Sequence, residues 1–446
     1  MDESKELRGF KLPSECVDNY VVDGVQSKVT EYELEEKGKL QFQESLRSVS
    51  ELNHPRSISR FHPTLPVLAC GVNGKVILFS AADGSIAFSH WQESRVKLGK
   101  RQTLTGFSYF AAIEWNVDGT LLAAGDDDGG VVVWSYPEGA ILFEARQHTA
   151  HSVIGNIQWN PFRHDVLSTW NIYEKNLLLW NSSSERNLFY EFEYEIEIRG
   201  VAWISESQIA LSFESGLIEI YEIDEGQPTA KIRVVQRLQH DSGVTWGGIQ
   251  WSDKTQHLAT CSRDGSIKVL KLIWIMASDQ PIHSFECPSS GCWLGCFAML
   301  IPRSGKSDND SESPENFTLA CGLEDGSIAI WSPLTKSEQS RHRILNFGPE
   351  NEVVVDSLSF SPDGRLLASL VGDEDGNQLM IWSTTTWMPV FANRIHVYYP
   401  FWLSWLTMES QSGVFYKLAV PQYVKRQDEV FVVELMPTGT NVHSHS

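Results

Sequence analysis

The chain has 446 residues, of which 42% are hydrophobic and 21% charged. This composition is ordinary for a folded globular protein and excludes wholesale disorder. Aspartate and glutamate number 57 against 36 lysine and arginine residues, which gives a formal net charge of -21. An acidic surface of this kind repels phosphate, so it argues against a broad nucleic-acid footprint and favours basic partners.

The cysteines and the N-terminus indicate the compartment. Seven cysteines are scattered along the chain, and an odd count without a regular framework is typical of reduced thiols inside the cell. The first ten residues, MDESKELRGF, hold no apolar core of a signal peptide. The longest apolar stretch, near residues 269–277, is too short to span a bilayer. We therefore expect a soluble intracellular protein.

Residues 1–50 form an N-terminal extension in this interpretation. Apolar and polar residues alternate in KVTEYELEEKGKLQFQES around Lys37 and Gly38, a pattern that favours a hairpin. Residues 1–26 leave two alternatives open, an ordered segment or a mobile tail, because chain termini fray unless they are tied down.

Residues 51–437 repeat one unit. Each unit runs from an apolar strand through an Asp/Gly turn to a strand rich in Leu, Ala and Ser, then through a second turn to a strand that closes on a large residue. The Asp-Gly pairs at 118–119, 264–265, 325–326 and 363–364 favour turns, since glycine adopts the positive φ that such turns need. The closing positions are Phe79, Trp134, Trp180, Tyr221, Leu270, Trp331, Trp382 and Leu435.

The repeat predicts an all-β propeller, because a recurring unit somewhat longer than ~40–45 residues with four short strands is typical of WD-repeat blades. Eight closing positions favour eight blades, with seven as the alternative. Closure of the ring requires an added strand, and residues 39–46 are the candidate that would complete the last blade. Residues 303–316 are expected to form a flexible insertion, and residues 438–446 a C-terminal tail.

Two stretches carry a more specific resemblance. The runs AAIEWNVDGTLLAAGDDDGGVVVW and RLQHDSGVTWGGIQWSDKTQHLATCSRDGSIKVLKL are similar to blades of the transducin-β-like, Ebi and Sif-type co-repressor group of WD-repeat proteins. The similarity covers residues 107–285 and returns at residues 358–382. It implies a nuclear scaffold, with the cytoplasm as the alternative, that docks histone tails and co-repressor or deacetylase subunits.

The chain also departs from that group. The group's N-terminal helical dimerisation module has no counterpart in the first 50 residues. None of the four closing tryptophans is followed by aspartate; the next residues are Ser135, Asn181, Ser332 and Ser383. The resemblance is therefore to a divergent member.

Polar residues at the turn before the third strand are expected to be structural. A buried aspartate there accepts backbone hydrogen bonds, often with a histidine at the start of the blade. The residues assigned this role are Asp128, His240, Asp264, Asp325 and Asp375.

The candidate binding face lies at the mouth of the central channel, where loops converge. Acidic residues beside aromatic ones suit a lysine or arginine of a peptide, through charge-assisted hydrogen bonds and cation–π contacts. The alternatives are solvated turn residues for the acids and packing between blades for the tryptophan. The candidates are Phe110, Asp126, Asp127, Arg199, Trp246, Arg263, Glu324, Asp356, Asp373, Glu374 and Phe401.

Enzyme motifs are missing from the sequence, which contains no GxxxxGK[ST], HExxH or GxSxG. A zinc site at Cys287, Cys292 and Cys296 with His283 nearby is the disfavoured alternative to buried thiols. We expect no catalytic residue, no metal site, no cofactor and no direct nucleic-acid contact.

The predicted function is a non-enzymatic protein-interaction scaffold in a chromatin or co-repressor complex. The alternative is an adaptor of another assembly, such as a ubiquitin-ligase substrate receptor. Those adaptors often carry an arginine three residues after the third-strand tryptophan, where this chain has Pro137, Ser183, Leu334 and Thr385.

Overall fold

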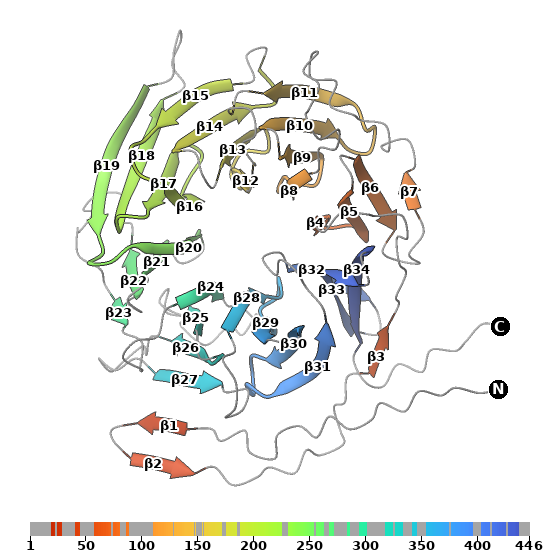
Figure 1. Ribbon diagram of the computed structural model, residues 1–446, viewed down its shortest axis with the longest axis vertical. Helices are drawn as coiled ribbons and strands as arrows, with labels where there is room; N and C mark the ends of the chain where they lie inside the picture. The colour runs from red at the N-terminus through yellow and green to blue at the C-terminus, as the bar shows by residue number, and fades with distance from the viewer. Residues whose placement is uncertain are drawn as a thin grey trace, which may run out of the picture.

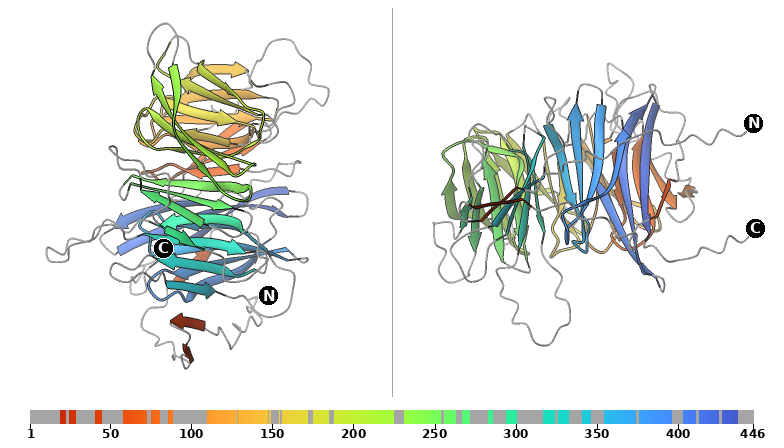
Figure 2. Two further views of the ribbon diagram at one scale, coloured as in Figure 1. Left: turned by 90° about the vertical axis from the view of Figure 1, so that its left-hand side faces the viewer. Right: turned by 90° about the horizontal axis from the view of Figure 1, so that it is seen from below.

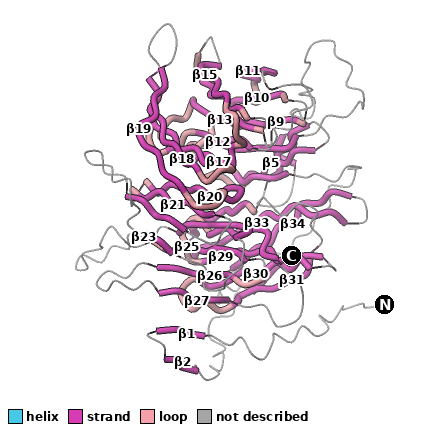
Figure 3. The backbone as a smooth tube through the Cα atoms, turned by 60° about the vertical axis from the view of Figure 1, so that its left-hand side comes forward, coloured by secondary structure: helices cyan, strands magenta, loops and turns pink. Residues whose placement is uncertain are grey.

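The structure is a computed structural model. It describes residues 19–22, 25–28, 41–44, 58–72, 75–80, 86–88, 110–127, 129–146, 148, 154, 156–171, 175–184, 188–224, 231–253, 256–262, 267–271, 283–285, 294–300, 317–323, 326–332, 341–345, 354–373, 376–395, 403–410, 413–424 and 427–436. These residues form strands and connecting loops (Figure 3). No helix among them is long and apolar enough to cross a membrane.

The described strands form eight four-stranded antiparallel sheets arranged around a common centre (Figure 1). The first four, named sheets 1 to 4 and given from the inner to the outer strand, are as follows. Sheet 1 is β4 (Ile58–Phe61), β5 (Val67–Val72), β6 (Lys75–Ser80) and β7 (Ile86–Phe88). Sheet 2 is β8 (Phe110–Trp115), β9 (Leu121–Asp126), β10 (Gly130–Ser135) and β11 (Ile141–Arg146). Sheet 3 is β12 (Asn156–Trp159), β13 (Val166–Trp170), β14 (Asn176–Asn181) and β15 (Leu188–Glu193). Sheet 4 is β16 (Ile198–Trp203), β17 (Gln208–Phe213), β18 (Leu217–Asp224) and β19 (Lys231–Gln239).

The remaining four, sheets 5 to 8, continue around the ring. Sheet 5 is β20 (Val244–Ser252), β21 (His257–Ser262), β22 (Ile267–Lys271) and β23 (His283–Phe285). Sheet 6 is β24 (Leu294–Leu300), β25 (Thr318–Leu323), β26 (Ile328–Ser332) and β27 (Arg341–Leu345). Sheet 7 is β28 (Val354–Phe360), β29 (Leu366–Asp373), β30 (Gly376–Ser383) and β31 (Pro389–Ile395). Sheet 8 is β32 (Ser404–Ser410), β33 (Gly413–Val424), β34 (Gln427–Met436) and β3 (Gln41–Glu44).

Sheet 8 joins the two ends of the chain. Its outer strand β3 pairs antiparallel with β34, with Gln41 opposite Met436 and Glu44 opposite Val433. This strand lies within residues 39–46, the segment proposed to close the ring. A separate hairpin, β1 (Asn19–Val22) with β2 (Val25–Lys28), lies beside β27 (Figures 1 and 2). The sequence analysis did not predict that hairpin.

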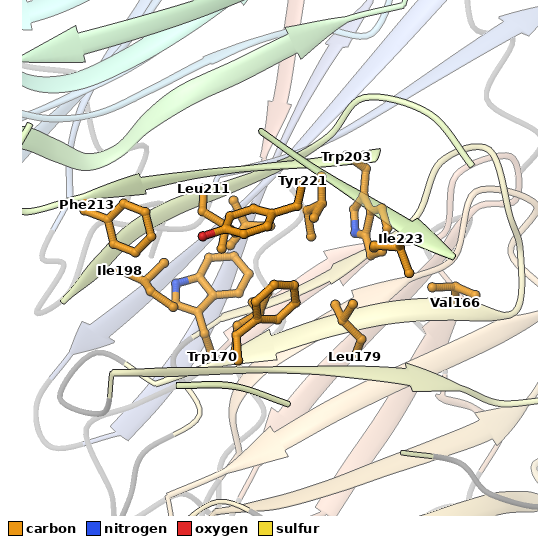
Figure 4. Packing of buried hydrophobic residues seen from close by; sticks show 13 residues of the cluster. Val166, Trp170, Leu179, Ile198, Trp203, Leu211, Phe213, Tyr221 and Ile223 are labelled. Atoms are coloured by element: carbon orange, nitrogen blue, oxygen red, sulfur yellow. The ribbon is translucent and has the colours of Figure 1, made fainter. Parts of the chain in front are cut away.

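The apolar core lies between neighbouring sheets. Alternate residues of a strand face the preceding and the following sheet, so each sheet buries both of its faces. Figure 4 shows the cluster between sheets 3 and 4, where Trp170 and Leu179 of sheet 3 pack against Trp203, Leu211 and Phe213 of sheet 4. Similar clusters lie between sheets 1 and 2, 2 and 3, 4 and 5, 5 and 6, 6 and 7, and 7 and 8. The strand patterning therefore positions the sheets radially.

Hydrogen bonds from inner-strand tryptophans link one sheet to the preceding one. The indole Nε1, from the last residue of β8, β12 and β16 and from the second residue of β32, donates to a backbone carbonyl of the neighbouring inner strand, which satisfies a donor that would otherwise be buried without a partner. The pairs are Trp115 to Arg60 O at 3.3 Å, Trp159 to Glu114 O at 3.0 Å, Trp203 to Gln158 O at 3.4 Å and Trp405 to Ser359 O at 3.1 Å. These tryptophans recur in the sequence because each one connects two sheets.

The turns that follow the inner strands are also linked. His62 Nε2 lies 3.0 Å from Gly119 O, and Asn116 Nδ2 donates to His164 O at 3.0 Å. Gly119 and Gly364, from two of the expected Asp-Gly turns, have φ of 75°, and Gly326 has φ of 77°. The positive φ expected at these glycines is confirmed.

Candidate peptide-binding face

The inner strands share a deviation near their first residues. The antiparallel register shifts after Phe110 in β8, Ile198 in β16, Leu294 in β24 and Val355 in β28, and over a wider stretch after Val244 in β20. A β-bulge of this kind leaves a residue unpaired and redirects its side chain. Because the strand order repeats around the ring, these bulges lie at the same end of the inner strands, on one face around the centre of the ring (Figure 1).

Three sequence-predicted residues occupy these bulges. Arg199 is the extra residue of β16, Asp356 is the extra residue of β28, and Trp246 lies within the irregular stretch of β20. The structure thus brings them to equivalent positions of different sheets. The sequence signal for them was their distance from the aromatic residue that ends the first strand.

Arg199 is buried beneath two glutamates. Its Nη2 lies 3.1 Å from Glu197 Oε2 and also bonds Glu214 Oε1. The arginine side chain is 6% exposed, whereas those of Glu197 and Glu214 are 34% and 43% exposed. A partner approaching β16 therefore meets the two carboxylates rather than the guanidinium. Sequence reasoning missed both glutamates, because their proximity depends on the turn between β17 and β18.

Asp356 is half-buried. Its Oδ2 accepts a hydrogen bond of 3.2 Å from Asn377 Nδ2 at the start of β30. Burial raises the pKa of the Asp356 carboxyl to about 6. Asn377 was not among the sequence candidates, and only the strand register, which places Gly372 opposite Asn377, shows its proximity.

Asp126 and Phe110 are corrections to the predicted face. Asp126 is 2% exposed, its Oδ1 accepts from Gly130 N at 2.5 Å, and Arg146 Nη2 lies 3.7 Å from its Oδ2. Phe110 is also 2% exposed, and its ring packs edge-on against Trp134 at 6.1 Å. Both side chains are buried and contact other residues of the protein, so neither is available to a peptide.

The nearby carboxyl of Glu144 belongs to the same internal group as Asp126. Its pKa is raised by burial first and then by the charge of Asp126, while Arg146 acts in the opposite direction. We infer that Asp126, Glu144 and Arg146 contribute to the stability of the fold.

Of the other candidates, the structure describes two and leaves four outside the described residues. Asp127 is partly exposed directly after β9, and Asp373 ends β29. Arg263, Glu324, Glu374 and Phe401 lie outside the described residues. Their membership of the face stays a prediction.

The expected structural histidine is buried and hydrogen-bonded. His240 is 1% exposed, and its Nε2 lies 2.8 Å from Thr260 Oγ1. His148 makes the equivalent contact with Thr169 at 3.0 Å, and the same threonine oxygen accepts from Trp180 Nε1. The turn residues Asp128, Asp264, Asp325 and Asp375 lie outside the described part of the chain.

Chemically, the described face offers carboxylates and hydrogen-bond acceptors. Among the described residues, no group of three or more His, Cys, Asp or Glu side chains is placed to hold a metal ion. Of the cysteines considered for zinc, Cys287 and Cys292 lie outside those residues, whereas the Cys296 thiol lies 3.4 Å from Val355 O.

Comparison with known proteins agrees with the geometry. The family model "WD domain, G-beta repeat" matches residues 100–135 and 232–270. WD repeat-containing protein 90 of Homo sapiens is 26% identical over 254 residues, covering 56% of this chain and 12% of that protein. SIR4-interacting protein SIF2 of Saccharomyces cerevisiae is 23% identical over 237 residues, covering 49% of this chain and 38% of the yeast protein. The matches thus span well under half the length of both relatives.

Two solved structures share the fold. The C-terminal WD40 domain of Sif2 superposes with a TM-score of 0.58 and 17% identity, covering 88% of this chain and 98% of the domain. The β-propeller domain of Cps50 (Swd1) from Myceliophteria thermophila gives a TM-score of 0.51 and 14% identity, with coverages of 72% and 95%. The radial sheets and these matches together show that the chain has an all-β propeller fold, in which residues 100–135 and 232–270 match the WD-repeat model.

Proposed function

We propose that this propeller is a non-enzymatic scaffold that docks a lysine- or arginine-rich segment, of the histone-tail type, at the channel mouth. The observation that carries the proposal is the arrangement at β16: the guanidinium of Arg199 is buried while Glu197 and Glu214 remain accessible. With Asp356 on another sheet, the described mouth presents carboxylates to a partner. The net charge of -21 adds a negative electrostatic potential around the molecule, which also attracts a basic partner.

We propose further that the complex concerned is a nuclear chromatin or co-repressor assembly that includes deacetylase subunits. The resemblance to the Sif-type group supports this assignment, as does the similarity to a yeast protein named for its interaction with SIR4. Methylosome protein WDR77 of Xenopus laevis, 26% identical over 42% of this chain and 48% of its own length, is likewise named for an assembly. WD-repeat propellers are protein-interaction platforms, and the acidic mouth supplies the chemistry for a basic peptide.

Calorimetry with a basic tail peptide at low and high salt tests the docking. We expect affinity to fall as salt rises, because exposed charges are screened beyond ~8 Å at physiological ionic strength. The double variant Asp127→Asn with Glu374→Gln should bind more weakly. The matched control, Glu138→Gln with Glu206→Gln, removes the same charge from exposed turns on the opposite face and should bind normally.

Salt-independent binding, or full affinity in the double variant, would show that the acidic rim is not the docking site. The protein could instead bind no basic tail but bind an acidic peptide tightly and lose that binding in Arg263→Ala. That outcome would show that the face recognises acidic rather than basic segments. An affinity pull-down identifies the assembly: deacetylase and co-repressor subunits support the proposal, whereas a ubiquitin-ligase scaffold supports the adaptor alternative.

A further inference from the structure

The carboxylate of Asp356 is held in one position by three features of sheet 7. The bulge between Val355 and Ser357 turns the residue out of the regular pairing, and Asn377 Nδ2 holds Oδ2 at 3.2 Å. Gly372 provides the space, since a Cβ at that position would lie 2.6 Å from Oδ2. A group whose position is set before binding loses little freedom when a ligand arrives.

No cation among the described neighbours compensates this carboxylate. The described strands in contact with β28 are β24, β25, β29 and β32, and β30 supplies Asn377. Their ionisable residues are Cys296, Cys321, Asp373 and Glu409, and these described strands contain no lysine, arginine or histidine. Burial also raises the pKa of the Cys296 thiol, so that group stays neutral.

Asp126 shows what a compensated carboxylate looks like in the same fold. It is fully buried, bonded by Gly130 N and placed beside Arg146. Asp356 instead keeps a partly exposed side chain, and its printed hydrogen-bond partner among the described residues is the neutral amide of Asn377. The difference indicates that the internal carboxylate serves stability, whereas the half-buried one has a charge that no described neighbour matches.

We propose that Asp356 is the anchor for one lysine or arginine side chain of the docked peptide, and that docking there is coupled to release of a proton. This inference rests on the proposed function and names the residue and the regulation within that face. A cation of the peptide supplies the charge that the described strands around Asp356 do not provide, through a charge-assisted hydrogen bond to the carboxylate. Protonation of the carboxyl removes that bond, so acid releases the peptide.

The expected change of affinity with pH follows from the linkage between peptide binding and protonation of Asp356. Because the pKa of free Asp356 is about 6, the ionised fraction rises about tenfold from pH 5 to pH 7. If the protonated form binds about tenfold more weakly than the ionised form, affinity should rise about fivefold over that interval. At pH 6, about half a proton should be released for each peptide bound, since the bound cation lowers the pKa of the carboxyl.

The test is calorimetry on the full chain. The probe is an octapeptide of alternating lysine and alanine with blocked ends, and its counterpart with every lysine acetylated is the uncharged control. Titrations at pH 5, 6 and 7, in buffers of different ionisation enthalpy at pH 6, give the affinities and the number of protons released. Histidines that gain charge at low pH weaken binding in all variants alike, so the comparison between variants isolates Asp356.

Asp356→Asn should lose about tenfold in affinity at pH 7, come within about twofold of the wild type at pH 5 and release no proton at pH 6. Gly372→Ala displaces the carboxylate without changing the net charge and should also weaken binding at pH 7. Glu206→Gln, which removes an exposed charge on the opposite face, should keep the wild-type profile. Melting temperatures show whether each variant is folded.

The outcomes separate this inference from the proposed function. A wild type that binds neither peptide overturns both. A wild type that prefers the lysine peptide, with Asp356→Asn unchanged in affinity and proton release, overturns the anchor alone. Equal binding of the acetylated peptide also overturns it, because the anchor requires a cation.

Discussion

The indole Nε1 of Trp180 donates a 2.8 Å hydrogen bond to Thr169 Oγ1, joining the third and second strands of sheet 3 within the core. The same oxygen lies 3.0 Å from His148 Nε2. A single threonine hydroxyl thus serves two buried rings, since it accepts from the Trp180 indole and is also hydrogen-bonded to His148 Nε2. A similar pair in sheet 7 joins Trp382 Nε1 to Ser369 Oγ at 2.9 Å.

Replacement of that hydroxyl should destabilise the fold. Thr169→Val keeps the shape of the side chain but leaves the Trp180 indole without its acceptor, at a cost of about 1–3 kcal/mol in the free energy of unfolding. Urea unfolding, followed by fluorescence and circular dichroism together, measures the loss. The exposed Thr385→Val serves as the control and should change little. Equal stability of the two variants would contradict the role given to Thr169.

The clusters between sheets should dominate stability. Leu179 is 0% exposed between sheets 3 and 4 (Figure 4), so Leu179→Ala should cost about 2–5 kcal/mol, through lost burial and the cavity left behind. Leu142, at 44% exposed on the outer strand β11, gives the control variant Leu142→Ala, for which we expect about 0.5 kcal/mol or less. The same urea experiment compares them, and similar losses would mean that the interface is not the main core.

His62 should make the fold sensitive to acid. Its Nδ1 accepts hydrogen bonds from Thr64 N at 3.1 Å and Leu65 N at 3.0 Å, and burial lowers its pKa, against weaker opposing effects of Gly119 O and Asp118. The unfolded chain therefore binds the proton more tightly. The contribution of His62 is complete above its ordinary pKa of 6.5 and is lost as the pH falls through that value towards the lower pKa of the folded state.

The comparison that isolates this contribution is wild type against His62→Gln. Wild type should lose unfolding free energy relative to the variant between pH 7.5 and pH 5. The raised pKa of Asp356 acts in the opposite direction below pH 6, but it is common to both proteins and cancels. Parallel pH profiles would show that His62 does not titrate on unfolding.

Removal of residues 1–48 should expose the outer edge of sheet 8. That deletion takes away β3 and leaves the edge of β34 free, and free edges template intermolecular pairing. We expect aggregation in light scattering and a lower melting temperature. Removal of residues 1–28 is the matched control, because it deletes only the hairpin of β1 and β2. A monomeric and equally stable protein without residues 1–48 would mean that the ring closes elsewhere.

Much of the fold could be predicted because each unit carries local signals. The tryptophans at 115, 159 and 203 end inner strands, and the Asp-Gly turns have the expected backbone conformation. The all-β propeller followed from these repeats and is confirmed by the neighbouring structures. The pairing of Gln41 with Met436 depends on residues at opposite ends of the chain, so alternation alone could only suggest it.

The candidate face could be predicted less well, because charge in the sequence does not reveal burial. Asp126 and Asp356 have the same side chain, yet one is enclosed by Gly130 and Arg146 and the other is not. That difference depends on which residues the strand register places opposite each other, and sequence spacing does not give it. Arg199 was placed correctly near a bulge, but its partners Glu197 and Glu214 decide what the surface presents.

The shared sheet 8 has a consequence for synthesis of the protein. A ribosome makes β3 before the strands of sheets 1 to 7, but its partner β34 ends at residue 436. Until β34 has emerged, sheets 1 to 7 can pack against one another only as an open arc. The outer faces of sheets 1 and 7 then have no neighbouring sheet to cover them. Such long-range closure is slow, and the waiting intermediate exposes strand edges. The nascent chain should therefore depend on chaperones until β34 has emerged, and premature termination before residue 427 should be deleterious even if all seven preceding sheets have formed.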